Sequence, residues 1–135
     1  EGWCGQTVWV NKNADGVISN NFWEPSEGMP AHEPDTLTAA KYVLNGTLPS
    51  AAVLDIGAWC GPFALYVASF GVGVFAVEPS PTAFKELISH FSAQPEANRA
   101  KLVGARVAIG DMWDTTMRVT SVGTSVDVIC RRPDL

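Results

Sequence analysis

The sequence predicts an α/β fold built on a mostly parallel sheet, and three observations support this. Short apolar segments that resemble buried strands alternate with longer segments whose apolar residues fall at helical spacing. The connections between them are short, which calls for right-handed crossovers between parallel strands. The chain has 135 residues, 47% of them hydrophobic and 17% charged, enough for one packed domain with a doubly wound sheet.

Residues 1–33 are the least regular part of the chain. Residues 7–10 are predicted to form a short strand, Asp15-Gly16 is a hairpin turn signal, and Val17-Ile18 would return as the second strand. Residues 20–30 are rich in Asn, Gly, Pro and Ser, which predicts a loop. We therefore expect an irregular N-terminal segment with a short hairpin.

The regular part begins at Pro34. This residue suits the first position of a helix, and Gly46 suits the position just past a helix end, so a helix is predicted between them. Residues 52–57 follow as a short and almost wholly apolar strand. A strand of this kind is usually buried on both faces, as in a parallel sheet.

A second helix is predicted to open at Gly61-Pro62 and to close at Gly71, and residues 72–77 form the second strand. A third helix begins at Ser80-Pro81, with Ser80 as its cap. Four apolar residues of this helix recur at helical spacing and predict one buried stripe: Phe84, Leu87, Ile88 and Phe91.

Residues 103–109 are predicted to form a third parallel strand. Residues 117–119 and 126–129 alternate in polarity around Gly123, which predicts a C-terminal β-hairpin. No helix follows to cover the last face of the sheet. We therefore expect a truncated fold in which residues 34–135 form a cofactor-binding domain that is incomplete at its C-terminal end.

Charge and cysteine content limit the partners. The formal net charge is −5, so the chain has no general attraction to phosphate backbones, and no nucleic-acid partner is expected. No apolar run approaches the roughly 20 residues of a membrane span. The three cysteines are an odd number at wide spacing, which fits neither a disulfide framework nor a metal site. The sequence does not specify a compartment, although the cytoplasm is favoured.

Three carboxylates follow the three predicted strands at the strand ends where open α/β sheets bind ligands: Asp55, Glu78 and Asp111. Asp55 holds the first glycine position of the G-x-G-x-x-G loop of nicotinamide enzymes. A carboxylate there would repel a pyrophosphate and attract an ammonium or sulfonium group. Glu78, 23 positions later, is placed to accept both hydroxyl protons of a ribose. The inferred ligand carries a ribose and a cationic group, as S-adenosylmethionine does.

Residues 53–68 and 77–87 resemble the FkbM-type S-adenosylmethionine-dependent methyltransferases, through the patterns DIGA..G and EP.P..F..L. Residues 105–111 and the segment 32–37 (HEPDTL) are similar to further elements of that family. The resemblance implies a Rossmann-like class I methyltransferase fold. The loop residues would hold the methionine part of the cofactor, Glu78 would bind the ribose and Asp111 would lie near the adenine; the cofactor-binding set is Asp55, Gly57, Ala58, Gly61, Glu78 and Asp111.

The resemblance further implies methyl transfer to the hydroxyl oxygen of a sugar or another small metabolite. The family's next strand, which ends in DVEG and normally lies beside the first, does not occur in this sequence. No catalytic residue is assigned: His32 is a candidate proton acceptor, and His90, where the family usually has Asn, is expected to be structural. Two alternatives stay open, a nicotinamide-dependent oxidoreductase on a similar sheet and a non-catalytic binding module.

Overall fold

The structure is a computed structural model that describes residues 2–3, 6–11, 33–46, 50–110, 115–121 and 124–130. In the strands at residues 2–3, 115–121 and 124–130 it describes the backbone but, apart from Arg118, no side chain.

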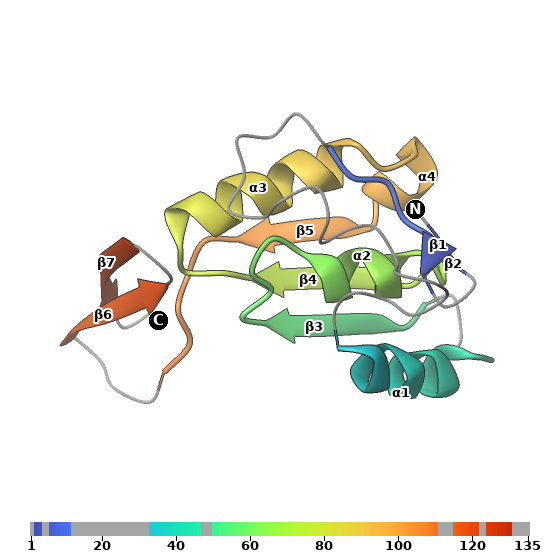
Figure 1. Cartoon of the computed structure of the whole chain (residues 1–135), viewed down its shortest axis with the longest axis horizontal. Helices are drawn as coiled ribbons and strands as arrows, with labels where there is room; N and C mark the ends of the chain where they lie inside the picture. Colours follow the sequence, from blue (N-terminus) through green and yellow to red (C-terminus); the bar gives the residue numbers. More distant parts are fainter. Residues whose placement is uncertain are drawn as a thin grey trace.

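The centre of the fold is a three-stranded parallel sheet in the order β3-β4-β5 (Figure 1). The strands are β3 (Ala52–Ile56), β4 (Gly73–Val77) and β5 (Leu102–Ala105). Leu54 pairs with Phe75, and Phe75 pairs with Val103. The predicted α/β architecture with parallel strands is therefore confirmed.

Strand β5 ends four residues before the predicted boundary at Ile109. The reason is its partner strand: β4 ends at Val77, and the Glu78 amide donates a last hydrogen bond of 3.1 Å to the Ala105 carbonyl. Pro79 has no N–H to continue the ladder. The apolar alternation runs on to Ile109, but the ladder with β4 stops at Ala105.

The helices begin where the sequence places proline. They are α1 (Pro34–Leu44), α2 (Pro62–Ala68), α3 (Pro81–Ser92) and the short α4 (Glu96–Arg99), which was not predicted. The Ser80 hydroxyl accepts a hydrogen bond from the Ala83 amide at 3.4 Å, which confirms the predicted cap of α3. Gly46 and Gly71 follow α1 and α2 with φ of +93° and +81°, as expected for residues just past a helix end.

Helices α2 and α3 cover the same face of the sheet. Val53 of β3 lies beside Phe63 and Val67 of α2, and Gly104 of β5 lies beside α3. The register places Val53 and Gly104 on one face, because each is in line with a residue of β4 that points the same way. Both crossovers step across the sheet in the same direction, and right-handed crossovers of that kind put their helices on one side.

The opposite face carries an exposed apolar row. Leu54, Phe75 and Val103 lie side by side in the register and are 56%, 44% and 50% exposed. The prediction that β3 is buried on both faces is therefore wrong. A doubly wound sheet needs a crossover that steps in the reverse direction, and none occurs among the described elements.

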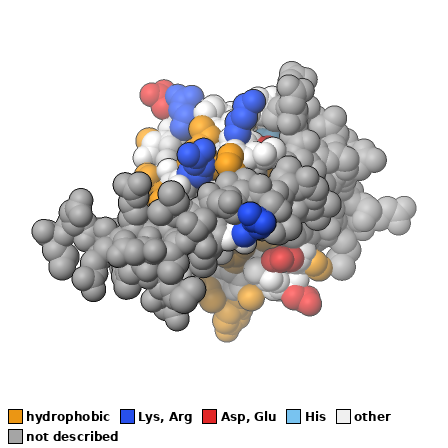
Figure 2. Space-filling view, turned by 90° about the vertical axis from the view of Figure 1, so that its left-hand side faces the viewer, with side chains coloured by type: hydrophobic (Ala, Val, Ile, Leu, Met, Phe, Trp, Pro, Cys, Tyr) orange, Lys and Arg blue, Asp and Glu red, His pale blue; other side chains and the backbone are white. Residues whose placement is uncertain are grey.

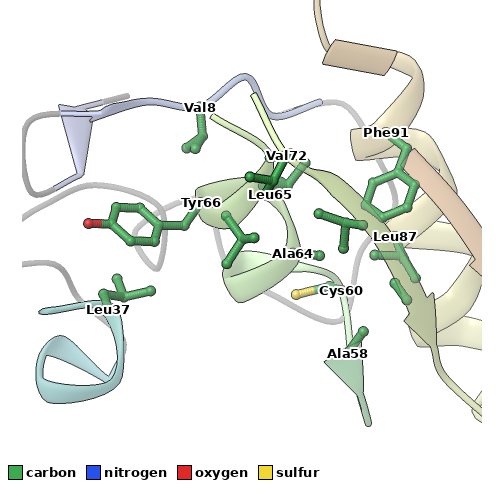
Figure 3. Close-up of a cluster of buried hydrophobic side chains, with 14 of the residues drawn as sticks. Val8, Leu37, Ala58, Cys60, Ala64, Leu65, Tyr66, Val72, Leu87 and Phe91 are labelled. Atoms are coloured by element: carbon green, nitrogen blue, oxygen red, sulfur yellow. The ribbon is translucent and has the colours of Figure 1, made fainter. Parts of the chain in front are cut away.

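The core lies between the helices and the covered face of the sheet. Leu65 and Tyr66 of α2 and Leu87 of α3 are its largest members from these helices with less than 2% exposure, and Val8 reaches the core from the N-terminal segment (Figure 3). The predicted stripe on α3 is confirmed in part: Leu87 and Phe91 are buried, whereas Ile88 is exposed.

At the N-terminus, β1 (Gly2–Trp3) and β2 (Gln6–Thr7) form a two-residue antiparallel ladder. The predicted strand at residues 7–10 is wrong beyond Thr7. Among the described residues, the backbone of this segment forms hydrogen bonds with the side chains of His90 in α3 and of Gln94 just past that helix, and not with a partner strand. The expected hairpin at Asp15-Gly16 and Val17-Ile18 lies outside the described residues.

At the other end of the chain, β6 (Thr115–Ser121) and β7 (Thr124–Cys130) form an antiparallel pair. This confirms the predicted C-terminal hairpin, with strands longer than expected. Gly123, at its predicted turn, lies outside the described residues.

Candidate functional site

A cavity of about 330 Å³ lies at the C-terminal end of β3, where parallel sheets bind ligands. Three of the predicted cofactor-binding residues, Asp55, Gly57 and Ala58, lie in its wall. The complete lining consists of Glu33, Thr36, Asp55, Ile56, Gly57, Ala58, Trp59, Pro62 and Phe63.

Asp55 is the main charged feature of this cavity. Its Oδ2 atom is buried and accepts no hydrogen bond from the described residues. Burial, and then the negative charges of Glu33 and Glu78, raise the pKa of Asp55 from 3.8 to about 6, and the Ala64 amide in the first turn of α2 partly offsets this. Above pH 6 the cavity therefore holds a carboxylate whose charge the surrounding structure disfavours.

The amides of the loop after β3 are already engaged. The N–H groups of Gly57 and Ala58 donate to the Val77 carbonyl at 2.8 and 3.0 Å, and the Trp59 N–H donates to Glu78 Oε2 at 2.9 Å. The helix that follows begins at Pro62, which has no N–H. Three consecutive amides of this loop are thus bonded to the end of β4 and do not face the cavity as a free set of donors.

Glu78 holds the loop in place from the end of β4. Its side chain is buried, and its two carboxylate oxygens accept hydrogen bonds from the Trp59 amide and, at 2.7 Å, from the Ser80 amide. Trp59 has a left-handed backbone with φ of +52°, which costs free energy in a residue with a side chain. Glu78 does not line the cavity, but it stabilises the conformation of a residue that does.

Gly61 has a packing role. It does not line the cavity, its φ is +93°, and a Cβ atom at this position would lie 2.5 Å from Leu87 Cδ1 of α3. Only glycine lets the loop approach α3 this closely. Asp111 and His32, also singled out in the sequence, lie outside the described residues.

Glu33 and Trp59 are two of the six lining residues that sequence reasoning missed. Glu33 is the N-cap residue of α1, has a left-handed backbone with φ of +43°, and raises the pKa of Asp55 through its negative charge. Glu33 belongs to the HEPDTL segment noted in the sequence, but that pattern did not predict that its side chain lines a cavity. Figure 2 looks onto the end of the molecule to which β3–β5 point, and acidic and hydrophobic side chains lie low in this view, where Figure 1 places α1.

A second cavity, of about 460 Å³, lies between α1 and α2. Its walls are almost wholly apolar and include Val43, Val53 and Val67. It shares Thr36 and Phe63 with the acidic cavity, so the two hollows meet at these side chains.

His90 and Cys60 are both buried. His90 accepts a hydrogen bond from the Asn11 amide, in line with its expected structural role. Cys60 is a free thiol, and burial raises its pKa above the ordinary value.

The described residues contain no group of three or more His, Cys, Asp or Glu side chains that could hold a metal ion. Within the same residues, no helix is long and apolar enough to cross a membrane.

Comparison with known proteins assigns no family. No protein-family model matches the chain, and no curated protein is similar to it at a significant level.

Proposed function

We propose that this chain is the cofactor-binding part of an S-adenosylmethionine-dependent methyltransferase of Rossmann-like, class I fold. The acceptor is a hydroxyl group of a sugar or another small metabolite. The observation that carries the proposal is the chemistry of the cavity at the end of β3. Asp55 Oδ2 has no hydrogen-bond donor among the described residues, and the amides of the adjoining loop are engaged elsewhere.

The charge of the cavity favours a cationic guest. Asp55 and Glu33 line it, and Glu78 lies close enough to raise the pKa of Asp55. An ammonium or sulfonium group beside Asp55 would relieve this repulsion and supply the buried Oδ2 atom with a partner. The residues present therefore fit the cationic end of S-adenosylmethionine.

The same features disfavour the alternative of a nicotinamide cofactor. Dinucleotide-binding loops hold the pyrophosphate with free backbone amides and the N-terminus of a helix. Here the amides of Gly57, Ala58 and Trp59 are engaged, Pro62 has no N–H to offer, and the carboxylate of Asp55 would repel the phosphates.

The cofactor supplies a methyl group activated by a sulfonium centre. The chain's own residues bind and orient: Asp55 attracts the positive charge, and Glu78 keeps Trp59 in the cavity wall. Contact between Glu78 and a ribose stays a prediction; it requires the binding site to extend beyond this cavity, because the Glu78 carboxylate is buried outside the cavity wall. Asp111 remains the proposed adenine contact. Alignment of the acceptor oxygen with the methyl group, and not a particular base, would supply most of the rate enhancement.

Isothermal titration calorimetry with S-adenosylhomocysteine, S-adenosylmethionine and NAD⁺ tests the proposal. We expect both adenosyl ligands to bind and NAD⁺ not to bind. Asp55→Asn should weaken adenosyl-ligand binding about 10- to 100-fold, the loss expected for one charge-assisted contact. Asp35→Asn removes the same charge from an exposed position outside the cavity and should change affinity less than about twofold.

Binding of NAD⁺ without a response to S-adenosylhomocysteine would replace this proposal with the oxidoreductase alternative. Equal affinity in the Asp55→Asn and Asp35→Asn variants would show that the cavity charge plays no part. A radiolabelled-methyl transfer assay with candidate alcohols then separates an enzyme from a module that only binds the cofactor.

A further inference from the structure

The segment Val8–Asn11, which we call the strap, is held on the fold by two side chains of α3, Ser89 and His90, and by Gln94, two residues past the end of this helix. The Trp9 amide donates to Gln94 Oε1 at 3.4 Å, and Gln94 Nε2 donates back to the Trp9 carbonyl. Two residues further on, the Asn11 amide donates to His90 Nδ1 at 3.0 Å and its side chain donates to Ser89 Oγ at 2.8 Å. Val8 is fully buried in the core.

The hydrogen bond from Asn11 defines the protonation state of His90. Because Nδ1 accepts, the neutral ring carries its proton on Nε2, which lies 3.5 Å from Glu86 Oε1. A second proton can bind only at Nδ1. There it would point an N–H group at the N–H group of Asn11, so the imidazolium and the docked strap exclude one another.

We propose that His90 is a pH-sensitive latch: the strap is docked while His90 is neutral and is released from α3 when Nδ1 takes up a proton. Release withdraws Val8 from the core and frees Ser89 of α3 and Gln94 just past the end of that helix. This inference goes beyond the proposed function and does not depend on it.

The surroundings of His90 set the direction of the switch. Burial lowers the pKa of His90 below its ordinary value of 6.5, and the carboxylate of Glu86 opposes this by favouring the charged ring. The strap itself brings no titratable side chain. The loop before α2 brings the thiol of Cys60, whose pKa burial and Glu86 raise, so that it stays neutral.

The linkage follows from these signs. The docked strap blocks protonation at Nδ1, so the undocked His90 has the higher pKa, and protons bind the released state more readily than the docked one. The docked state is therefore fully favoured above pH 6.5, and its population decreases as the pH falls below 6.5. Between pH 7.5 and 5.5 the released population should rise by up to about tenfold.

Hydrogen–deuterium exchange of the whole chain, corrected for the intrinsic pH dependence of exchange, tests the latch. We expect the peptide that contains residues 8–11 to lose protection by up to about tenfold from pH 7.5 to 5.5, while the peptide of α2 (Pro62–Ala68) keeps its protection. In His90→Asn, a neutral amide oxygen replaces Nδ1 as acceptor without titrating, so protection of the strap should no longer depend on pH.

Glu86→Gln gives a second measurement that does not remove the histidine. Loss of the carboxylate disfavours the imidazolium, so release should move to lower pH. Three outcomes would overturn the proposal: unchanged strap protection between pH 7.5 and 5.5, equal loss of protection in the strap and α2, or the same pH dependence in His90→Asn as in the original chain.

Discussion

Replacing Asp55 by Asn should stabilise the unliganded protein at neutral pH. The fold raises the pKa of this carboxyl group from 3.8 to about 6, chiefly by burial and by the charges of Glu33 and Glu78. An asparagine has nearly the same shape, carries no charge and keeps an oxygen for the Ala64 amide. The substitution therefore removes the repulsion while leaving the local packing intact.

The size of the effect follows from the change in pKa. A rise from 3.8 to about 6 corresponds to about 3 kcal/mol, at about 1.4 kcal/mol for each pH unit. Asp55 is only half-buried, and solvent screening reduces this figure to about 1–2 kcal/mol. The folded state binds the proton of Asp55 more tightly than the unfolded state does. The favourable contribution is thus fully present below pH 3.8 and is lost as the pH rises through about 6.

Urea denaturation of both proteins at half-unit steps from pH 4 to 8 measures this difference. The free energies of unfolding should be nearly equal at pH 4, and Asp55→Asn should be more stable by about 1–2 kcal/mol at pH 7.5. Two parallel curves, or a difference that shrinks as the pH rises, would refute the reasoning that Asp55 is held at the cost of stability.

Three further predictions concern the same loop. Glu78→Ala should lower the free energy of unfolding by about 2–4 kcal/mol, because two backbone amides lose a charged acceptor, and Glu78→Gln by less; urea denaturation at pH 7.5 compares them. Gly61→Ala should cost about 2–4 kcal/mol, since its Cβ would clash with Leu87, whereas Gly57→Ala, equally left-handed but with no atom within 4 Å, should cost about 1 kcal/mol. Equal losses in the two alanine variants would exclude the clash. Binding of a cationic ligand at pH 5.5 should release protons from Asp55, so the observed enthalpy should depend on the buffer at pH 5.5 and not at pH 8.

Many element boundaries of the fold follow from the positions of proline and glycine in the sequence. Prolines mark the starts of α1, α2 and α3, and Gly46 and Gly71 follow two of their ends, so these boundaries were predictable from local chemistry. The end of β5 was not predictable in this way, because it depends on where β4 stops. The exposed face of the sheet was missed for a similar reason: an apolar strand does not reveal which side its crossovers cover.

In the candidate site, too, the residues that belong to a local sequence pattern were predictable, and those that depend on tertiary structure were not. Asp55, Gly57 and Ala58 were identified because a strand end followed by a glycine loop is a local pattern. Glu33 reaches the cavity through the placement of α1, about 20 residues earlier in the chain, and no periodicity records that placement. The hydrogen bond from the Trp59 amide to Glu78 depends on the left-handed turn at Trp59, which the sequence does not mark with a glycine.

The energetics of Asp55 argue that the cavity is a binding site. A neutral side chain would fill this position at lower free energy, and the Ala64 amide alone does not offset the burial of the charge. Neighbouring carboxylates increase the repulsion, and Glu78 at the same time keeps the amide of Trp59 from satisfying a phosphate. A fold retains such a group when the charge serves binding, because a bound cation relieves the repulsion that destabilises the unliganded protein. The destabilisation of the unliganded chain and the affinity for a positively charged guest are, on this reasoning, two measurements of one interaction.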